Sequence, residues 1–273
     1  MILALILFLG LAVSAVQGGE PLPQFGICSH RGWMSEFPEN TIPALQAAVA
    51  MKAQMIEFDV RFTKDRKMVL LHDWTVDRTS NGRGPILDLT FDEVRALDFG
   101  SWKSPRFAGT QIPTLDEALA VMPRNILLNI HLGGVPPEIT VELAQAVAEK
   151  IVADDRVDQA FIAGDHAIAD AVKAKYPQVK ICNMHRQGGS DAYIDDTIAR
   201  GCEFIQLSGD LPTAEGIAKL KAAGVKINYF GTDDPNMMRK LYDLGVEFPL
   251  VDKLEVGMKF FDDFTNEHAR KGR

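Results

Sequence analysis

Eight short apolar runs with β-strand character recur along the chain, and amphipathic, helix-like stretches separate most of them. The β-like runs cover residues 25–29, 55–60, 125–132, 159–163, 180–184, 202–207, 225–230 and 248–251. The helix-like stretches cover residues 41–53, 137–153, 167–176, 192–200, 213–223 and 235–244. Because strands that are joined through helices run parallel, this alternation predicts a parallel sheet covered by helices.

The length of the chain indicates how such a sheet closes. With 273 residues, the chain has the usual size of one barrel of eight strand–helix units. An open, doubly wound sheet is the alternative, but the sequence contains no glycine-rich dinucleotide turn. We therefore predict an α/β fold, a (β/α)8 TIM barrel, over residues 19–273.

The strand–helix rhythm is interrupted once, after the second predicted strand. An additional β-like run at 68–72 is followed there by a long polar segment, so the interruption spans about residues 61–114. Loops that follow the strands of a barrel form its active face. We interpret this segment as an insertion that covers a site.

The N-terminal residues resemble a targeting signal. Residues 2–13 are apolar, small residues follow, and no charged side chain precedes Glu20. We interpret residues 1–18 as a cleaved signal peptide and expect an exported protein, either periplasmic or secreted. An uncleaved anchor is the alternative, but a membrane-spanning helix needs about 20 apolar residues. We expect no transmembrane segment after cleavage.

Composition narrows the possible partners. The formal charge of −8 argues against a general nucleic-acid-binding protein, which needs clustered Lys and Arg. We expect a small-molecule ligand and no nucleic acid. The three cysteines, Cys28, Cys182 and Cys202, lie in or beside apolar strand-like runs without metal-ligand spacing, and we interpret them as buried thiols.

Two of the predicted strands carry polar side chains on one face. Side chains alternate along a strand, so Glu57 and Asp59 share a face that points into the barrel. Two carboxylates in a low-dielectric interior repel each other, and a bound cation relieves this repulsion. The alternative is a pair of acids matched by Lys or Arg. By the same alternation, Asn129 and His131 face the interior, and His131 is either a third ligand or a hydrogen-bonded core residue.

Three further polar residues lie at strand ends. His30 and Arg31 follow the first predicted strand, and His72 ends the additional β-like run. Two histidines at one reaction centre can act as the base and the acid of a displacement. Arginine binds phosphoryl oxygens with two parallel hydrogen bonds. Each residue taken singly could also be a cap or a core partner.

Short motifs follow one another in order over about 90 residues: His30-Arg31-Gly32, Pro38-Glu39-Asn40-Thr41, Glu57-Phe58-Asp59-Val60, His72-Asp73, Asp77-Arg78-Thr79 and Ile112-Pro113-Thr114-Leu115. This ordered set resembles the signature of the glycerophosphodiester phosphodiesterase family, a group of TIM barrels. The strand rhythm, together with Gly245, Val246 and Asp252, extends the likeness to about residue 255.

The resemblance implies a role for each of the polar residues. His30 and His72 would be the acid/base pair, Glu57 and Asp59 metal ligands, and Arg31 a phosphate contact. Enzymes of the family use a divalent cation, here Mg, Ca, Mn or Zn, and cleave glycerophosphodiesters to glycerol phosphate and an alcohol. In their usual mechanism, the glycerol hydroxyl next to the phosphate attacks first, and the cyclic phosphate is then hydrolysed.

The sequence departs from the family pattern in three places. The family's third strand normally has Glu in place of His131 and Lys in place of Gly133, and the Trp-Thr of its seventh strand is replaced by Phe230-Gly231. An imidazole in place of a carboxylate favours metals that accept nitrogen ligands. His185 and Arg186, which follow the fifth strand, could restore the positive charge for phosphate binding.

The function expected from this resemblance is metal-dependent hydrolysis of a glycerophosphodiester by histidine acid/base catalysis. Two alternatives remain. One is a barrel that has lost turnover and binds phosphorylated or sugar-like ligands. The other is a head-group lyase that resembles the sphingomyelinase D branch of the same barrel.

Overall fold

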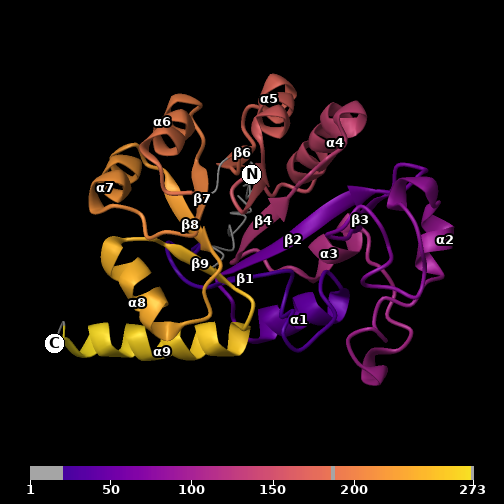
Figure 1. The fold of residues 1–273 in the computed structure, drawn as a ribbon, viewed down its shortest axis with the longest axis horizontal. Helices are drawn as coiled ribbons and strands as arrows, with labels where there is room; N and C mark the ends of the chain where they lie inside the picture. The colour runs from indigo at the N-terminus through magenta and orange to yellow at the C-terminus, as the bar shows by residue number, and fades with distance from the viewer. Residues whose placement is uncertain (1–20, 186–187, 272–273) are drawn as a thin grey trace, which may run out of the picture.

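A computed structural model describes residues 21–185 and 188–271, and it shows a closed barrel of parallel strands surrounded by helices (Figure 1). The barrel strands are β1 (Cys28–Ser29), β2 (Met55–Phe62), β4 (Leu127–His131), β5 (Ala160–Gly164), β6 (Lys180–Asn183), β7 (Phe204–Ser208), β8 (Lys226–Phe230) and β9 (Phe248–Val251). The barrel closes because β1 pairs with both β2 and β9, so that Cys28 lies opposite Met55 and Leu250. The predicted TIM barrel is confirmed. The predicted signal peptide and Arg186 lie outside the described residues.

Helices follow the strands and cover the outside of the barrel (Figure 1). They are α1 (Ile42–Ala50), α3 (Leu115–Val121), α4 (Thr140–Ala153), α5 (His166–Lys175), α6 (Asp191–Ala199), α7 (Ala214–Ala222), α8 (Pro235–Leu244) and α9 (Leu254–Lys271). The predicted helix at 137–153 is a 3-10 turn, η3 (Pro137–Ile139), that continues into α4. The sequence analysis did not predict α3, which is short, or α9, which has no further strand after it.

The alternation of side chains along the strands separates two layers of the core. On β2, Ile56 and Phe58 point outward and pack against the helices. Met55, two residues before Glu57, points inward and packs with Leu127 of β4 and Phe161 of β5 inside the barrel. Glu57 and Asp59 therefore face the barrel interior, as the alternation predicts. Cys28, Cys182 and Cys202 are free and buried, as expected.

The segment between β2 and α3 forms the insertion after the second barrel strand. It contains β3 (Met68–Leu70), which pairs antiparallel with β2, then η1 (Ile86–Asp88), α2 (Phe91–Arg95) and η2 (Pro105–Phe107). These elements bury a small apolar cluster of their own that includes Val69, Ile86 and Phe99. In Figure 1 the segment extends to one side of the barrel.

Among the helices of the described residues, none combines the length and the apolar composition that crossing a membrane requires.

Candidate active site at the ends of the barrel strands

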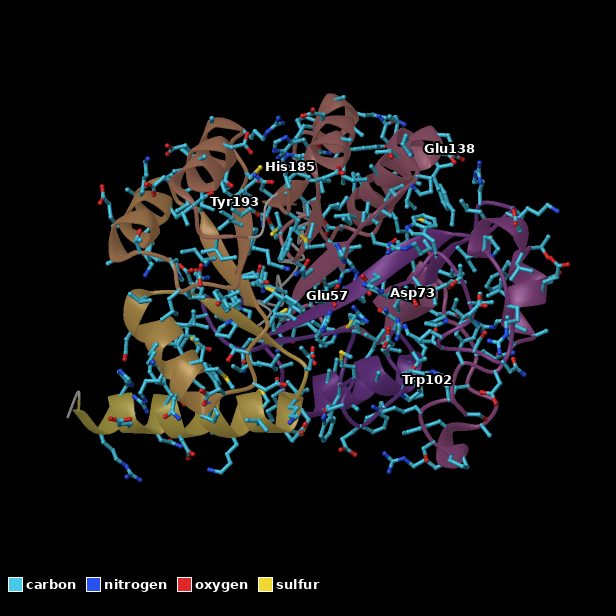
Figure 2. All side chains as sticks on the ribbon, in the orientation of Figure 1. Glu57, Asp73, Trp102, Glu138, His185 and Tyr193 are labelled. Carbon is cyan, nitrogen blue, oxygen red and sulfur yellow. The ribbon has the colours of Figure 1, made fainter. Side chains whose placement is uncertain are left out.

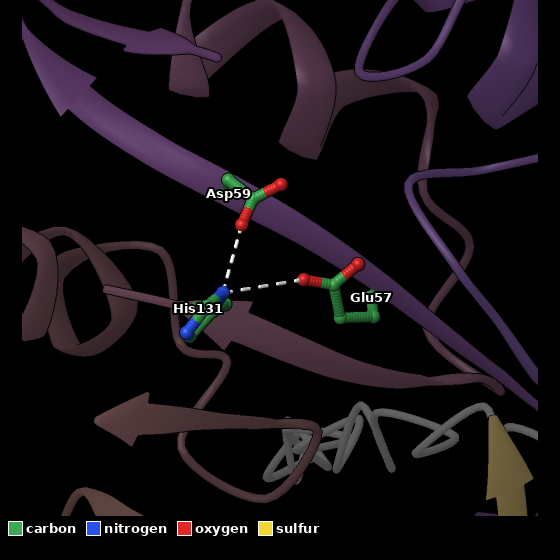
Figure 3. Close-up of side chains that lie close together, drawn as sticks. All are labelled: Glu57, Asp59 and His131. Atoms are coloured by element: carbon green, nitrogen blue, oxygen red, sulfur yellow. Dashed lines mark hydrogen bonds and ion pairs between the residues drawn. The ribbon is translucent and has the colours of Figure 1, made fainter. Parts of the chain in front are cut away.

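Three potential metal ligands converge where β2 and β4 lie side by side. The two strands are in register, with Asp59 opposite His131. His131 Nδ1 lies 2.8 Å from Asp59 Oδ1 and 3.8 Å from Glu57 Oε1 (Figure 3). One ligand atom from each of the three residues lies within 4.8 Å of the others. His131 thus turns toward the two acids.

The loop after β1 holds the second oxygen of each acid. The backbone N–H of Arg31 donates to Glu57 Oε2 over 3.0 Å. The Asn40 amide donates to Asp59 Oδ2 over 2.8 Å and accepts from the Asp59 backbone N–H over 3.1 Å. These bonds leave Oε1 of Glu57 and Oδ1 of Asp59 directed at His131. Supporting contacts of this kind orient the ligands of metal sites.

Burial and charge act differently on the two acids. Burial, followed by the negative charge of Asp59, raises the pKa of Glu57 well above its usual range. Burial would also raise the pKa of Asp59, but the hydrogen bond with His131 and the charges of His131, Arg61 and Arg31 lower it overall. Asp59 is therefore the more firmly ionised of the pair, whereas the charge of Arg31 offsets only part of the effect of burial on Glu57.

This donor set fits a divalent cation. Two carboxylate oxygens and one imidazole nitrogen form a compact group, and a cation there would stabilise the ionised form of Glu57. The mixed oxygen and nitrogen donors also suit ions that accept nitrogen. The alternative, in which arginine matches the two acids, holds only in part. Arg31 Nε lies 3.4 Å from Oδ2 of one of them, Asp59.

Each of the two histidines expected to act as acid or base contacts a carboxylate. His30 Nδ1 lies 2.6 Å from Oδ1 of Asp252, which follows β9. His72 Nδ1 lies 2.6 Å from Oδ1 of the adjacent Asp73. A carboxylate at Nδ1 fixes the tautomer and leaves Nε2 available for proton transfer. Both histidines therefore share the same arrangement, with a carboxylate at Nδ1 and Nε2 available for proton transfer.

Arg78 of the insertion bonds two carboxylates, Asp73 next to His72 and Glu39 next to Arg31. Its guanidinium donates to Asp73 over 2.8 and 3.1 Å and to both oxygens of Glu39 over 2.8 Å. Glu39 in turn accepts from Arg31 Nη1 over 2.8 Å. One arginine therefore connects the carboxylate beside His72 with the carboxylate beside Arg31.

A cavity of about 200 Å³ opens among these side chains. It is lined by His30, Arg31, Glu57, His72, His131, Met184, Gln206, Phe230 and Leu250. One part of the wall is charged or imidazole-bearing, and the part from β8, β9 and the end of β6 is mostly apolar. Phe230 packs edge-on against the ring of His30, with 5.3 Å between ring centroids.

His185 does not line this cavity. Its ring stacks on His166 at 3.9 Å between centroids, in a separate cavity bordered by Tyr193 and Asp196. Figure 2 shows His185 near Tyr193, apart from Glu57. The phosphate contact predicted for His185 and Arg186 stays a prediction, and Arg31 is the predicted phosphate-binding residue that the structure places at the cavity.

Several residues of this site had no role in the sequence analysis. Asp252, Asp73, Glu39, Asn40 and Arg78 appeared there only as parts of motifs or as a point of likeness. Asp252 could have been suspected, because it directly follows a buried strand at the same end of the barrel as His30. Arg78 offered no such signal, because it lies within a loop.

Comparisons with known proteins give the family of the chain. The family model described as "Glycerophosphoryl diester phosphodiesterase family" matches residues 30–256. The chain is 48% identical over 116 residues to the Bacillus subtilis protein YhdW, a match covering 42% of this chain and 48% of that protein. It is 36% identical over 166 residues to a glycerophosphodiester phosphodiesterase of Caldanaerobacter subterraneus, covering 59% of this chain and 67% of the relative. The match thus spans about half the length of the first of these relatives.

A solved structure supports the fold. A phosphodiesterase of Oleispira antarctica, in complex with the product sn-glycerol-3-phosphate, superposes with a TM-score of 0.78 at 24% identity. The superposition covers 88% of this chain and 96% of that one. At this identity the likeness concerns the barrel alone, whereas the family model matches the sequence itself over most of the chain. The chain belongs to the glycerophosphoryl diester phosphodiesterase family.

Proposed function

We propose that the protein is a metal-dependent phosphodiester hydrolase that cleaves glycerophosphodiesters to glycerol phosphate and an alcohol. The observation that carries this proposal is the joint placement of two carboxylate-bound histidines, one arginine and a compact metal-ligand group around one cavity. Family membership supports the same reaction class.

The two histidines would exchange protons with the substrate. The glycerol hydroxyl next to the phosphate attacks phosphorus, and its proton passes to one imidazole. The bond between phosphorus and the alcohol oxygen breaks, and the other imidazole protonates the departing alcohol. Water then opens the cyclic phosphate, with the two imidazoles in exchanged roles. Asp252 and Asp73 keep both rings oriented during these transfers.

Glu57, Asp59 and His131 would hold the cation, which supplies positive charge for the phosphoryl oxygens and the nucleophile. Arg31 lines the same cavity and can donate to a phosphoryl oxygen. Its bond to Glu39 and its contact with Asp59 hold the guanidinium at the cavity wall before substrate binds.

An activity panel tests this function. Purified protein would be stripped of metal, supplied with Mg²⁺, Ca²⁺, Mn²⁺ or Zn²⁺, and assayed for glycerol phosphate release from several glycerophosphodiesters. We expect release only with metal. A protein that binds these diesters without releasing product would instead support a ligand-binding barrel. Release of a cyclic phosphate as the final product from a lysophospholipid would support the head-group lyase.

We also propose that the protein is exported, on the basis of the apolar run at residues 2–13. Full-length protein and a variant lacking residues 1–18 would be expressed in a bacterial host. We expect only the full-length protein outside the cytoplasm, shortened at its N-terminus. Equal retention of both proteins in the cytoplasm would contradict export.

A further inference from the structure

The backbone after β4 passes directly beneath the imidazole of His131. A β-carbon placed on Gly133 would lie 2.6 Å from both Cε1 and Nε2 of that ring. Non-bonded carbon atoms sit at about 3.5 Å or more from each other. The ring of His131 therefore occupies the space that any side chain at position 133 would need.

The rotamer that creates this conflict is the one that brings His131 to the acids. With the ring over Gly133, Nδ1 faces Asp59 Oδ1 at 2.8 Å and Glu57 Oε1 at 3.8 Å. Cε1 and Nε2 lie nearest to Gly133, and Nδ1 lies 3.5 Å from the same β-carbon position. To reach ordinary contact with a β-carbon at 133, the ring would have to move by roughly 0.9 Å. Ligand distances in metal sites tolerate about 0.2 Å, so this movement would take Nδ1 out of range.

The backbone cannot easily yield in place of the ring. The carbonyl of Gly133 accepts a hydrogen bond from Trp74 Nε1 over 3.3 Å. The Trp74 ring is itself held by the guanidinium of Arg61, 4.7 Å from the ring centroid. Arg61 is buried and donates to the backbone carbonyl of His72. The backbone at Gly133 is thus joined to the insertion through Trp74.

From this packing we infer that Gly133 is a positioning residue that admits a histidine as a metal ligand at position 131. The two residues form a matched pair, in which the absence of a side chain at 133 is a condition for imidazole ligation at 131. A glutamate at 131 has no rigid ring and one more rotatable bond, so it would not depend on the glycine in the same way. This inference rests on the proposed metal site of Glu57, Asp59 and His131.

The test measures Zn²⁺ binding to the metal-stripped protein by isothermal titration calorimetry, without an activity assay. We expect Gly133→Ala to weaken Zn²⁺ binding by about tenfold or more, the usual effect of disturbing the support of a ligand. In a His131→Glu background, the same Gly133→Ala change should alter affinity by less than about threefold. The effect of the alanine should therefore depend on the residue at 131.

A matched control separates the ring contact from a general disturbance of the loop. Gly134 has φ +59, a conformation that Asn tolerates, and among the described residues a β-carbon there would meet only Trp74 Nε1, at 3.9 Å. Gly134→Asn should retain Zn²⁺ affinity within about threefold of the unmodified protein. Melting temperatures of the metal-free variants would verify that each is folded.

The outcomes distinguish the pairing from the metal site itself. If Asp59→Asn abolishes Zn²⁺ binding while Gly133→Ala leaves it unchanged, the metal site stands and the pairing is wrong. If Gly133→Ala weakens binding equally in both backgrounds, the glycine acts on the loop and not through His131, and the pairing is again wrong. If the unmodified protein and Asp59→Asn bind Zn²⁺ equally, the proposed metal site fails, and the pairing fails with it.

Discussion

At the scale of single residues, the two histidines of the cavity differ in their surroundings but share one contact. His30 is nearly buried beside Phe230, whereas His72 is more exposed and lies within the insertion. Each places Nδ1 2.6 Å from an aspartate oxygen. The shared contact, more than the surroundings, is what proton transfer requires, because it orients Nε2.

Replacing either histidine should therefore slow the reaction without unfolding the protein. We expect His30→Ala and His72→Ala each to lower kcat by about 100-fold or more on the best substrate, the usual contribution of a general acid or base. His268, an exposed residue of α9 whose ring contacts the carbonyl of Phe264, is the matched control, and His268→Ala should leave kcat unchanged. A histidine of the cavity that can be replaced without loss of kcat is not part of the acid/base pair.

Gly32 illustrates how one backbone position supports the site. It has φ +74, and a β-carbon there would lie 2.7 Å from the carbonyl carbon of Ala44 in α1. Gly84 also has positive φ, +98, but a β-carbon there would meet nothing within 4 Å. Gly84→Ala should cost about 1 kcal/mol of unfolding free energy from backbone strain alone, and Gly32→Ala about 3 kcal/mol or more from strain plus overpacking. Urea denaturation measures both, and equal losses would show that the contact with α1 is unimportant.

At the scale of elements, the insertion is joined to the barrel by polar contacts as well as by strand pairing. Arg78 lies in the loop after β3 and bonds both Asp73 and Glu39, which belong to segments following different strands. The arrangement ties the insertion to the loop after β1. Both loops carry residues that line the cavity, so their relative position matters for the site.

The ionisation of Asp73 gives this connection a pH dependence. The hydrogen bond from Arg78, opposed by partial burial and aided by His72, lowers the pKa of Asp73 to about 2. Burial would raise the pKa of Glu39, but Arg78 and Arg31 lower it overall. Unpaired Asp and Glu carboxyls have pKa values of about 3.9 and 4.3. Because the folded pKa values are depressed, the added stability is present above about pH 4 and is lost as pH falls toward 2.

Arg78→Gln should remove this contribution. We expect the variant to melt at a lower temperature than the unmodified protein at about pH 6, and the difference to shrink as pH falls from about 4 to 2. Thermal unfolding of both proteins across this pH range measures the difference in melting temperature. Arg106, a more exposed arginine that approaches Glu36, serves as control, and Arg106→Gln should show little difference at any pH. If the difference in melting temperature between Arg78→Gln and the unmodified protein stayed constant down to about pH 2, the proposed role of Arg78 would be wrong.

At the scale of the whole molecule, the proposed metal site would link two neighbouring strands to the loop after β1. A cation bound only by the folded protein stabilises it by about 2.7 kcal/mol at a hundredfold excess over Kd. For a chain of this size we expect chelation to lower Tm by roughly 5–10 °C from the metal-saturated value. Asp59→Asn is the control and should show no metal-dependent change in Tm. If exhaustive chelation left both the Tm and the activity of the unmodified protein unchanged, the proposed metal dependence would be wrong.

The sequence alone determined the barrel and the direction of its key side chains. Eight apolar runs alternating with helical stretches left few other folds open, and the alternation within β2 placed Glu57 and Asp59 in the interior. These features are local. The direction of a side chain on a strand depends on its position in a two-residue repeat, and the order of strands follows from short connections between them.

Only the tertiary structure decided which side chains act together. His30 and Asp252 lie 222 positions apart and meet because the first and last strands close the barrel. Arg78 reaches Glu39, 39 positions away in the sequence, because the insertion packs against the loop after β1. His185 follows a barrel strand just as His30 does, yet it stacks on His166 outside the cavity. Strand position brings a residue to one end of the barrel, whereas its contacts depend on loop conformation and rotamer, which arise from packing between distant segments.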